Sequence, residues 1–155
     1  MKITTVEEVK QLMQSRDALA LQGVENQTDE LCLATVKQCP LALQYVKNQT
    51  PEICVAAVEE FGGALKFVKE QTDDICLAAV QQFGNALEFV ENQTKEICLA
   101  AVENNGLALK FVKDKTIDIC LAALKGDYAA IYYCDPDLRE ILDKEFTKCY
   151  VNGED

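Results

Sequence analysis

The residues of this chain that could do chemistry are its cysteines, of which there are eight. Five recur at an interval of 22 residues, and these are Cys32, Cys54, Cys76, Cys98 and Cys120. Cysteine thiolates can form disulfides, bind zinc or attack an electrophile. The chain has no histidine, which excludes Ser-His-Asp and Cys-His catalysis and histidine metal sites.

The interval between the cysteines predicts that they are packing residues. Stacked helices lie about 8–10 Å apart, whereas a disulfide needs Cα atoms within about 7 Å, and zinc needs its thiolates in a tight cluster. A ladder with one cysteine per repeat can therefore neither pair nor bind a metal within itself. Cys39 and Cys134 stand where other repeats have apolar residues, so only Cys149 lies outside the pattern. This use of cysteine predicts a reducing compartment and no cofactor.

Threonine and glutamine recur at the same interval. The threonines are Thr28, Thr50, Thr72, Thr94 and Thr116. A glutamine precedes four of them, at Gln27, Gln49, Gln71 and Gln93, and Lys115 takes the fifth position. The glutamine amides could be presented to an extended peptide, or they could satisfy backbone groups of their own or the next repeat. We favour the second interpretation.

The elements that must position these residues are short helices. Thr50 is a good N-cap for a first helix, in which Ile53, Ala57 and Phe61 lie on one face. Gly62 is expected to end that helix in a left-handed conformation, and a second, shorter helix follows. Helices of about ten and about seven residues do not persist alone in water. They require packing against each other and against neighbouring repeats.

The sequence therefore predicts one all-α solenoid of short helical hairpins with capping helices at both ends. Residues 1–27 form an N-terminal cap and an eroded repeat, 28–134 form five 22-residue repeats, and 135–155 form a C-terminal capping helix and tail. The N-terminal cap contains a helix from Thr5 to about Arg16. A leucine-rich repeat has a similar period. It needs a Leu-x-Leu strand, whereas the apolar block here reads Ile-Cys-Leu-Ala-Ala-Val and is spaced for a helix.

The repeated blocks Ile-Cys-Leu-Ala-Ala-Val, Gly-x-Ala-Leu-x-Phe-Val and Gln-Thr resemble a short helical repeat family of unknown function associated with giant amoeba-infecting DNA viruses. The resemblance covers residues 27–134. It implies a viral protein that works in the host cytoplasm, and it transfers no catalytic residue because the family has no agreed activity. The departures, at Pro40, Lys115 and Asp127-Tyr128, are typical of repeats at the edge of an array.

Net charge sets the expected partners. The chain carries −11, from 26 acidic and 15 basic residues, which makes nucleic acid an unexpected partner. Most of the excess falls on the first helices, at Asp29, Glu30, Glu52, Glu59, Glu60, Asp73, Asp74, Glu96, Glu103 and Asp118, against Lys37, Lys95 and Lys125. Such a face suits a basic partner, although the helix dipole alone favours the acids in first turns.

No membrane or secretion signal is apparent. The N-terminal segment lacks a hydrophobic signal core, and no apolar run approaches the roughly 20 residues of a membrane span. We therefore expect a cytoplasmic protein with no membrane partner, in the host cytoplasm if the protein is viral.

The candidate binding residues are outward positions that change from repeat to repeat. They are Gln44, Lys66, Glu88, Lys110 and Tyr132 in one column, and Lys47, Lys69, Glu91 and Lys113 in another. The last repeat adds Tyr128 and, beyond it, Tyr150. Tyrosine is common at interfaces, but the C-terminal helix could instead fold over these rings.

These patterns predict a non-enzymatic scaffold that binds another protein. The chain has no glycine-rich phosphate loop, nucleophile motif or metal-ligand spacing. The alternative is a self-assembling structural protein, a homo-oligomer joined through the solenoid ends or the C-terminal tyrosines.

Overall fold

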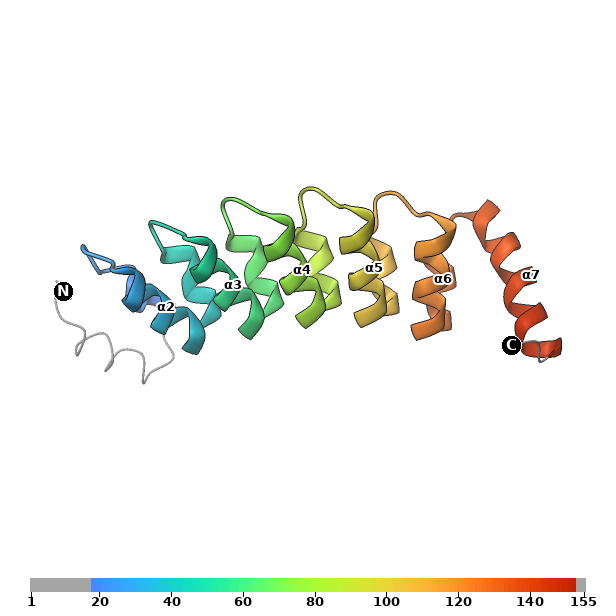
Figure 1. The fold of residues 1–155 in the computed structure, drawn as a ribbon, viewed down its shortest axis with the longest axis horizontal. Helices are drawn as coiled ribbons and strands as arrows, with labels where there is room; N and C mark the ends of the chain where they lie inside the picture. The colour runs from blue at the N-terminus through green and yellow to red at the C-terminus, as the bar shows by residue number, and fades with distance from the viewer. Residues whose placement is uncertain (1–17, 153–155) are drawn as a thin grey trace.

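The computed structural model describes residues 18–152, and side-chain surroundings are described up to residue 144. Helices follow one another along a rod, and no β-strand occurs in the described range (Figure 1). The all-α solenoid is therefore confirmed, and the strand-bearing alternative is wrong. The helix expected from Thr5 to Arg16 lies outside the described residues, as do the side chains of Cys149 and Tyr150.

Five α-helices of ten residues each begin 22 residues apart. They are α2 (Asp29–Gln38), α3 (Pro51–Glu60), α4 (Asp73–Gln82), α5 (Lys95–Asn104) and α6 (Ile117–Gly126). Each is followed by a 3-10 helix, namely η2 (Pro40–Tyr45), η3 (Gly62–Phe67), η4 (Gly84–Phe89), η5 (Gly106–Phe111) and η6 (Tyr128–Tyr133). The short η1 (Ala18–Leu21) precedes this array, and α7 (Pro136–Asn152) follows it.

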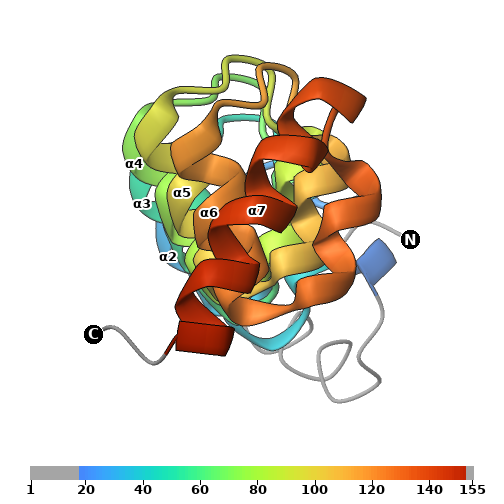
Figure 2. The ribbon, with the colours of Figure 1, turned by 90° about the vertical axis from the view of Figure 1, so that its right-hand side faces the viewer.

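The second helix of each repeat is a six-residue 3-10 helix, tighter than an α-helix. A 3-10 helix rises about 2.0 Å per residue and an α-helix about 1.5 Å, so the two helices of a repeat span about 12 and about 15 Å. They can therefore lie side by side with little overhang. Viewed along the rod, the α-helices form one row, the 3-10 helices form a second row, and the connecting loops line one edge (Figure 2).

One continuous apolar core runs between the two rows. In the second repeat, Ile53, Ala57 and Val58 of α3 face Leu65 of η3, and each is at most 1% exposed. The equivalent residues of the other repeats are buried in the same way. Each short helix is thus held by its row neighbours, as a solenoid requires.

The repeating glycines allow neighbouring repeats to approach closely. Gly62, Gly84 and Gly106 begin the 3-10 helices, and none has a left-handed backbone conformation. The prediction that Gly62 is a left-handed helix terminator was therefore wrong. A Cβ atom at Gly62 would lie 2.5 Å from the carbonyl oxygen of Ala79 in the next α-helix, and the other two glycines show the same distance. A side chain at any of these three glycines would require the neighbouring backbone to shift.

Candidate functional site

The glutamine ladder joins each repeat to the next. The Nε2 of Gln49 donates to the carbonyls of Leu43 at 3.1 Å and Phe67 at 2.9 Å, and its Oε1 accepts from the N–H of Lys69 at 2.9 Å. Equivalent bonds to the next repeat are made by Gln27, Gln71 and Gln93. The prediction that these amides satisfy backbone groups of their own and the next repeat is confirmed.

The threonine hydroxyls cap four of the five α-helices. Thr28, Thr50, Thr72 and Thr94 each accept from the backbone N–H three residues further on, at 3.3–3.4 Å. Thr116 makes no such bond. It follows Lys115, the residue that interrupts the glutamine ladder and donates instead to the Val112 carbonyl at 3.0 Å.

The five ladder cysteines are buried free thiols, as expected of packing residues. Burial raises the pKa of Cys76 to about 11. Burial, followed by a hydrogen bond with Cys134, raises the pKa of Cys120 to about 12. Thiols of this kind stay protonated near neutral pH and are poor nucleophiles. Within the described residues, no group of three or more cysteine or carboxylate side chains is placed to hold a metal ion.

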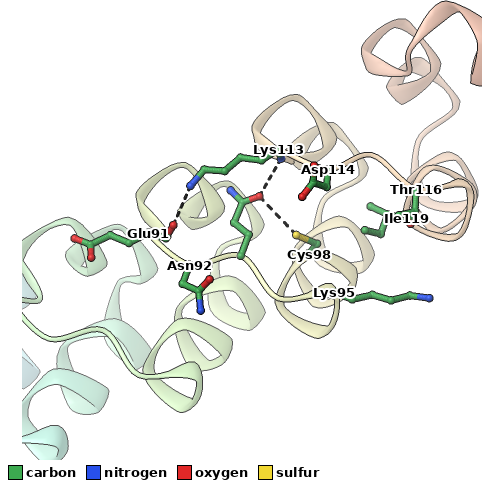
Figure 3. A pocket seen from close by; sticks show the side chains of 9 residues that line it. Glu91, Asn92, Lys95, Cys98, Lys113, Asp114, Thr116 and Ile119 are labelled. Carbon is green, nitrogen blue, oxygen red and sulfur yellow. Dashed lines mark hydrogen bonds between the residues drawn. The ribbon is translucent and has the colours of Figure 1, made fainter.

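In the candidate column that contains Lys47, Lys69, Glu91 and Lys113, the lysines bond other repeats of the same chain. The Nζ of Lys69 donates to the carbonyls of Val46 at 3.2 Å and Lys47 at 3.1 Å, in the loop of the preceding repeat. Lys113 reaches the carbonyl of Glu91 at 2.9 Å in the same way, beside a hollow of about 370 Å³ between two loops (Figure 3). Lys47 makes two such bonds as well. These ammonium groups bridge successive loops, so they are less available to a partner.

The other candidate column, which begins with Gln44, lies along the row of 3-10 helices. Gln44, Lys66, Glu88, Lys110 and Tyr132 are all exposed. Lys66 and Lys110 place Nζ 4.6 Å from the ring centroids of the half-buried Phe67 and Phe111, a cation–π arrangement. The column therefore presents four different residue types over five repeats, above a regular series of rings.

The acidic side chains predicted on the first helices are all exposed on the α row. Between the α-helices of the described residues, one ion pair forms, from Lys95 to Asp118. The α row thus carries the negative charge that the sequence indicated.

Sequence reasoning missed an exposed aromatic pair at the edge where α-helices turn into 3-10 helices. Phe61 was predicted on the core-facing side of its helix, but it follows α3 and is 42% exposed. Its ring stacks on that of Phe83, with centroids 6.4 Å apart. A change of residue type in this column, from phenylalanine to Asn105 and Asp127, was the signal that could have revealed it.

The C-terminal helix covers the last repeat only in part. Arg139 donates to the carbonyls of Tyr132 at 3.0 Å and Cys134 at 3.3 Å, and Tyr128 bonds Asp143 at 2.8 Å. Tyr132 nevertheless stays 75% exposed. Within α7, Leu142 is buried, whereas its neighbour Ile141 is exposed.

Part of the repeat array matches a known family model. The model of a domain of unknown function (DUF4116) matches residues 72–117 and, in an overlapping position, residues 94–139. The second match begins 22 residues after the first, which is the distance between successive α-helices here. No curated protein and no solved structure matches the chain. The resemblance to a repeat without assigned function is thus supported, while the association with giant viruses stays a prediction.

No helix within residues 18–152 is long and apolar enough to cross a membrane.

Proposed function

We propose that the protein is a non-enzymatic scaffold that binds another protein along its 3-10 row. The observation that supports this is a contrast between columns. Core and ladder positions keep nearly the same residue in every repeat, whereas the exposed column beside the aromatic rings changes from Gln44 to Lys66, Glu88, Lys110 and Tyr132. A structural rod needs no such variation, but recognition of one particular partner does.

The proposed partner is a protein, because the net negative charge of the chain disfavours nucleic acid. We place the interaction in the cytoplasm because buried free thiols suit a reducing compartment. If the association with giant viruses holds, this would be the cytoplasm of an infected amoeba.

Affinity capture followed by titration tests the proposal. The immobilised protein should recover a stoichiometric partner from source-cell lysate, and the purified partner should lose at least about tenfold in affinity for Lys66→Glu/Lys110→Glu. The matched control is Lys37→Glu/Lys125→Glu, which makes the same change of charge on the α row and should leave affinity within about twofold. Equal losses in both variants, or none in either, would count against binding on the 3-10 row.

Self-assembly is a second candidate, and the exposed Tyr132 and Ile141 near the C-terminal end favour it. Light scattering across a concentration series decides between the two. Growth in mass that Tyr132→Ser abolishes would support assembly, and a monomer at every concentration would eliminate it.

A further inference from the structure

The edge that holds Phe61 and Phe83 departs from what local stability favours. The residue before a 3-10 helix can cap it, and Asn105 and Asp127 do so: their Oδ1 atoms accept from the N–H two residues further on, at 3.1 and 2.9 Å. Phe61 and Phe83 occupy the same position and provide no such bond. Two repeats thus lack a cap that the same chain forms in two others.

The rings of Phe61 and Phe83 are also exposed, although two other repeats carry a polar residue in the same column. Phe61 is 42% and Phe83 39% exposed. A Cβ atom at Gly63 would lie 2.6 Å from the Phe61 ring, so the ring lies directly against the backbone there. The Phe61 ring therefore packs on the backbone of its own repeat as well as on the Phe83 ring.

Two acidic residues beside Phe61 in the chain also lower the stability of their own helix. Glu59 and Glu60 form the last turn of α3, where the negative end of the helix dipole disfavours carboxylates. In the first and last repeats of the array, the equivalent turns carry Lys37 and Lys125. Neither Glu59 nor Glu60 is in a salt bridge within the described part of the chain. Two acids thus directly precede Phe61 in the chain, and no cation among the described residues forms a salt bridge with them.

We propose that this edge, formed by Glu59, Glu60, Phe61 and Phe83, binds a segment of a partner protein in which an arginine adjoins an apolar residue. A guanidinium group can stack on an aromatic face and bond a carboxylate with the same plane of atoms, which an ammonium group cannot. The apolar neighbour covers the part of the patch that the guanidinium leaves open. The inference rests on the proposed function as a scaffold, and it names the chemistry recognised and a second surface.

Peptide selection tests this without knowledge of the partner. A phage library of random dodecapeptides is panned on the wild-type protein and counter-selected on Phe61→Asn/Phe83→Asn. Asparagine at these positions can make the cap that Asn105 makes, so this variant should fold, which thermal melting by circular dichroism checks. The enriched peptides should contain arginine beside an apolar residue.

Synthetic copies of the enriched peptides are then titrated by fluorescence anisotropy. Phe61→Asn/Phe83→Asn and Glu59→Gln/Glu60→Gln should each lower affinity by about tenfold or more. Glu96→Gln/Glu103→Gln is the matched control, because it makes the same change of charge on α5, where no aromatic pair is present. It should change affinity by less than about twofold.

The inference is overturned if no peptide is enriched, if the enriched peptides lack arginine, or if the control lowers affinity as much as Glu59→Gln/Glu60→Gln. Peptides that lose binding to Lys66→Glu/Lys110→Glu but not to the phenylalanine variant would also overturn it. That last outcome would leave the proposed function in place, so the two failures can be told apart.

Discussion

Replacing Gln49 with alanine tests whether the glutamine ladder holds the repeats together. The substitution removes three hydrogen bonds to backbone groups at 2.9–3.1 Å, which connect the 3-10 helix before Gln49 to the loop and helix after it. It also removes the weaker bond from the Cys54 thiol to the Gln49 Oε1 at 3.9 Å. The residue sits in a loop, so helix propensity does not change. Any loss of stability therefore reports on contacts between repeats.

The magnitude follows from those three bonds. Each contributes a net of about 1 kcal/mol, and Gln49 is half-buried, so water can reach part of what is left unbonded. We expect Gln49→Ala to lower the free energy of unfolding by about 2–3 kcal/mol. Because each repeat contacts only its neighbours, the same change can also uncouple the two halves of the rod, which lowers the urea m-value.

Urea unfolding followed by far-UV circular dichroism measures both quantities. The control is Gln44→Ala, since Gln44 is exposed and donates only to Leu41 within its own 3-10 helix, at 3.0 Å. That variant should change stability by less than about 0.5 kcal/mol. Equal effects of the two variants would refute the inference that the ladder amide couples the repeats.

Three further predictions follow from the packing and the thiols. Gly84→Ala should destabilise by about 2 kcal/mol or more in thermal unfolding, because its Cβ would lie 2.5 Å from the Ala101 carbonyl. Gly126→Ala, whose nearest outside atoms lie at 3.9 Å, should be neutral or stabilising by up to about 1 kcal/mol. Ala79→Leu should cost about 1–3 kcal/mol in the same assay, since the site is fully buried; a neutral result would contradict that packing. Burial raises the pKa of Cys76 from 9.0 to about 11, so the folded state keeps a proton that the unfolded chain loses. The stability that this thiol confers is complete below pH 9.0 and falls as the pH rises toward about 11. In urea unfolding, the stability of the wild type relative to Cys76→Ala should therefore decrease over that range, and a constant difference would contradict a raised pKa.

The features that could be predicted from the sequence are those that a single repeat determines and the other repeats copy. The interval of the α-helices, the capping by Thr50 and the burial of Cys54 each depend on residues close together in the chain. The role of Gln49 was also within reach, because an amide beside a helix start in every repeat has few other uses. Repetition made each of these signals stronger than in a non-repeating sequence.

The features that were missed depend on where the next repeat lies. Gly62 follows an α-helix and so has the sequence context of a left-handed terminator, but the need for glycine comes from the close approach of the Ala79 carbonyl. The helical period of apolar residues continues through Phe61, while the chain itself leaves the helix there. Lys69 likewise gave no sign that its ammonium group would bond a loop of the preceding repeat. For Gly62 and Lys69, the decisive contacts lie in a neighbouring repeat.

The C-terminal end of the array bears on the choice between scaffold and self-assembly. In the other repeats a glutamine donates to the carbonyl at the end of the next 3-10 helix, but Lys115 makes no such bond and reaches Val112 instead. The carbonyls of Tyr132 and Cys134 are bonded by Arg139 of α7. The hydrogen-bond donors to these carbonyls of the last repeat therefore come from the same chain and not from a second copy. A second copy that stacked on these carbonyls would compete with Arg139 for them, which favours a partner that binds along the rod over one that extends it.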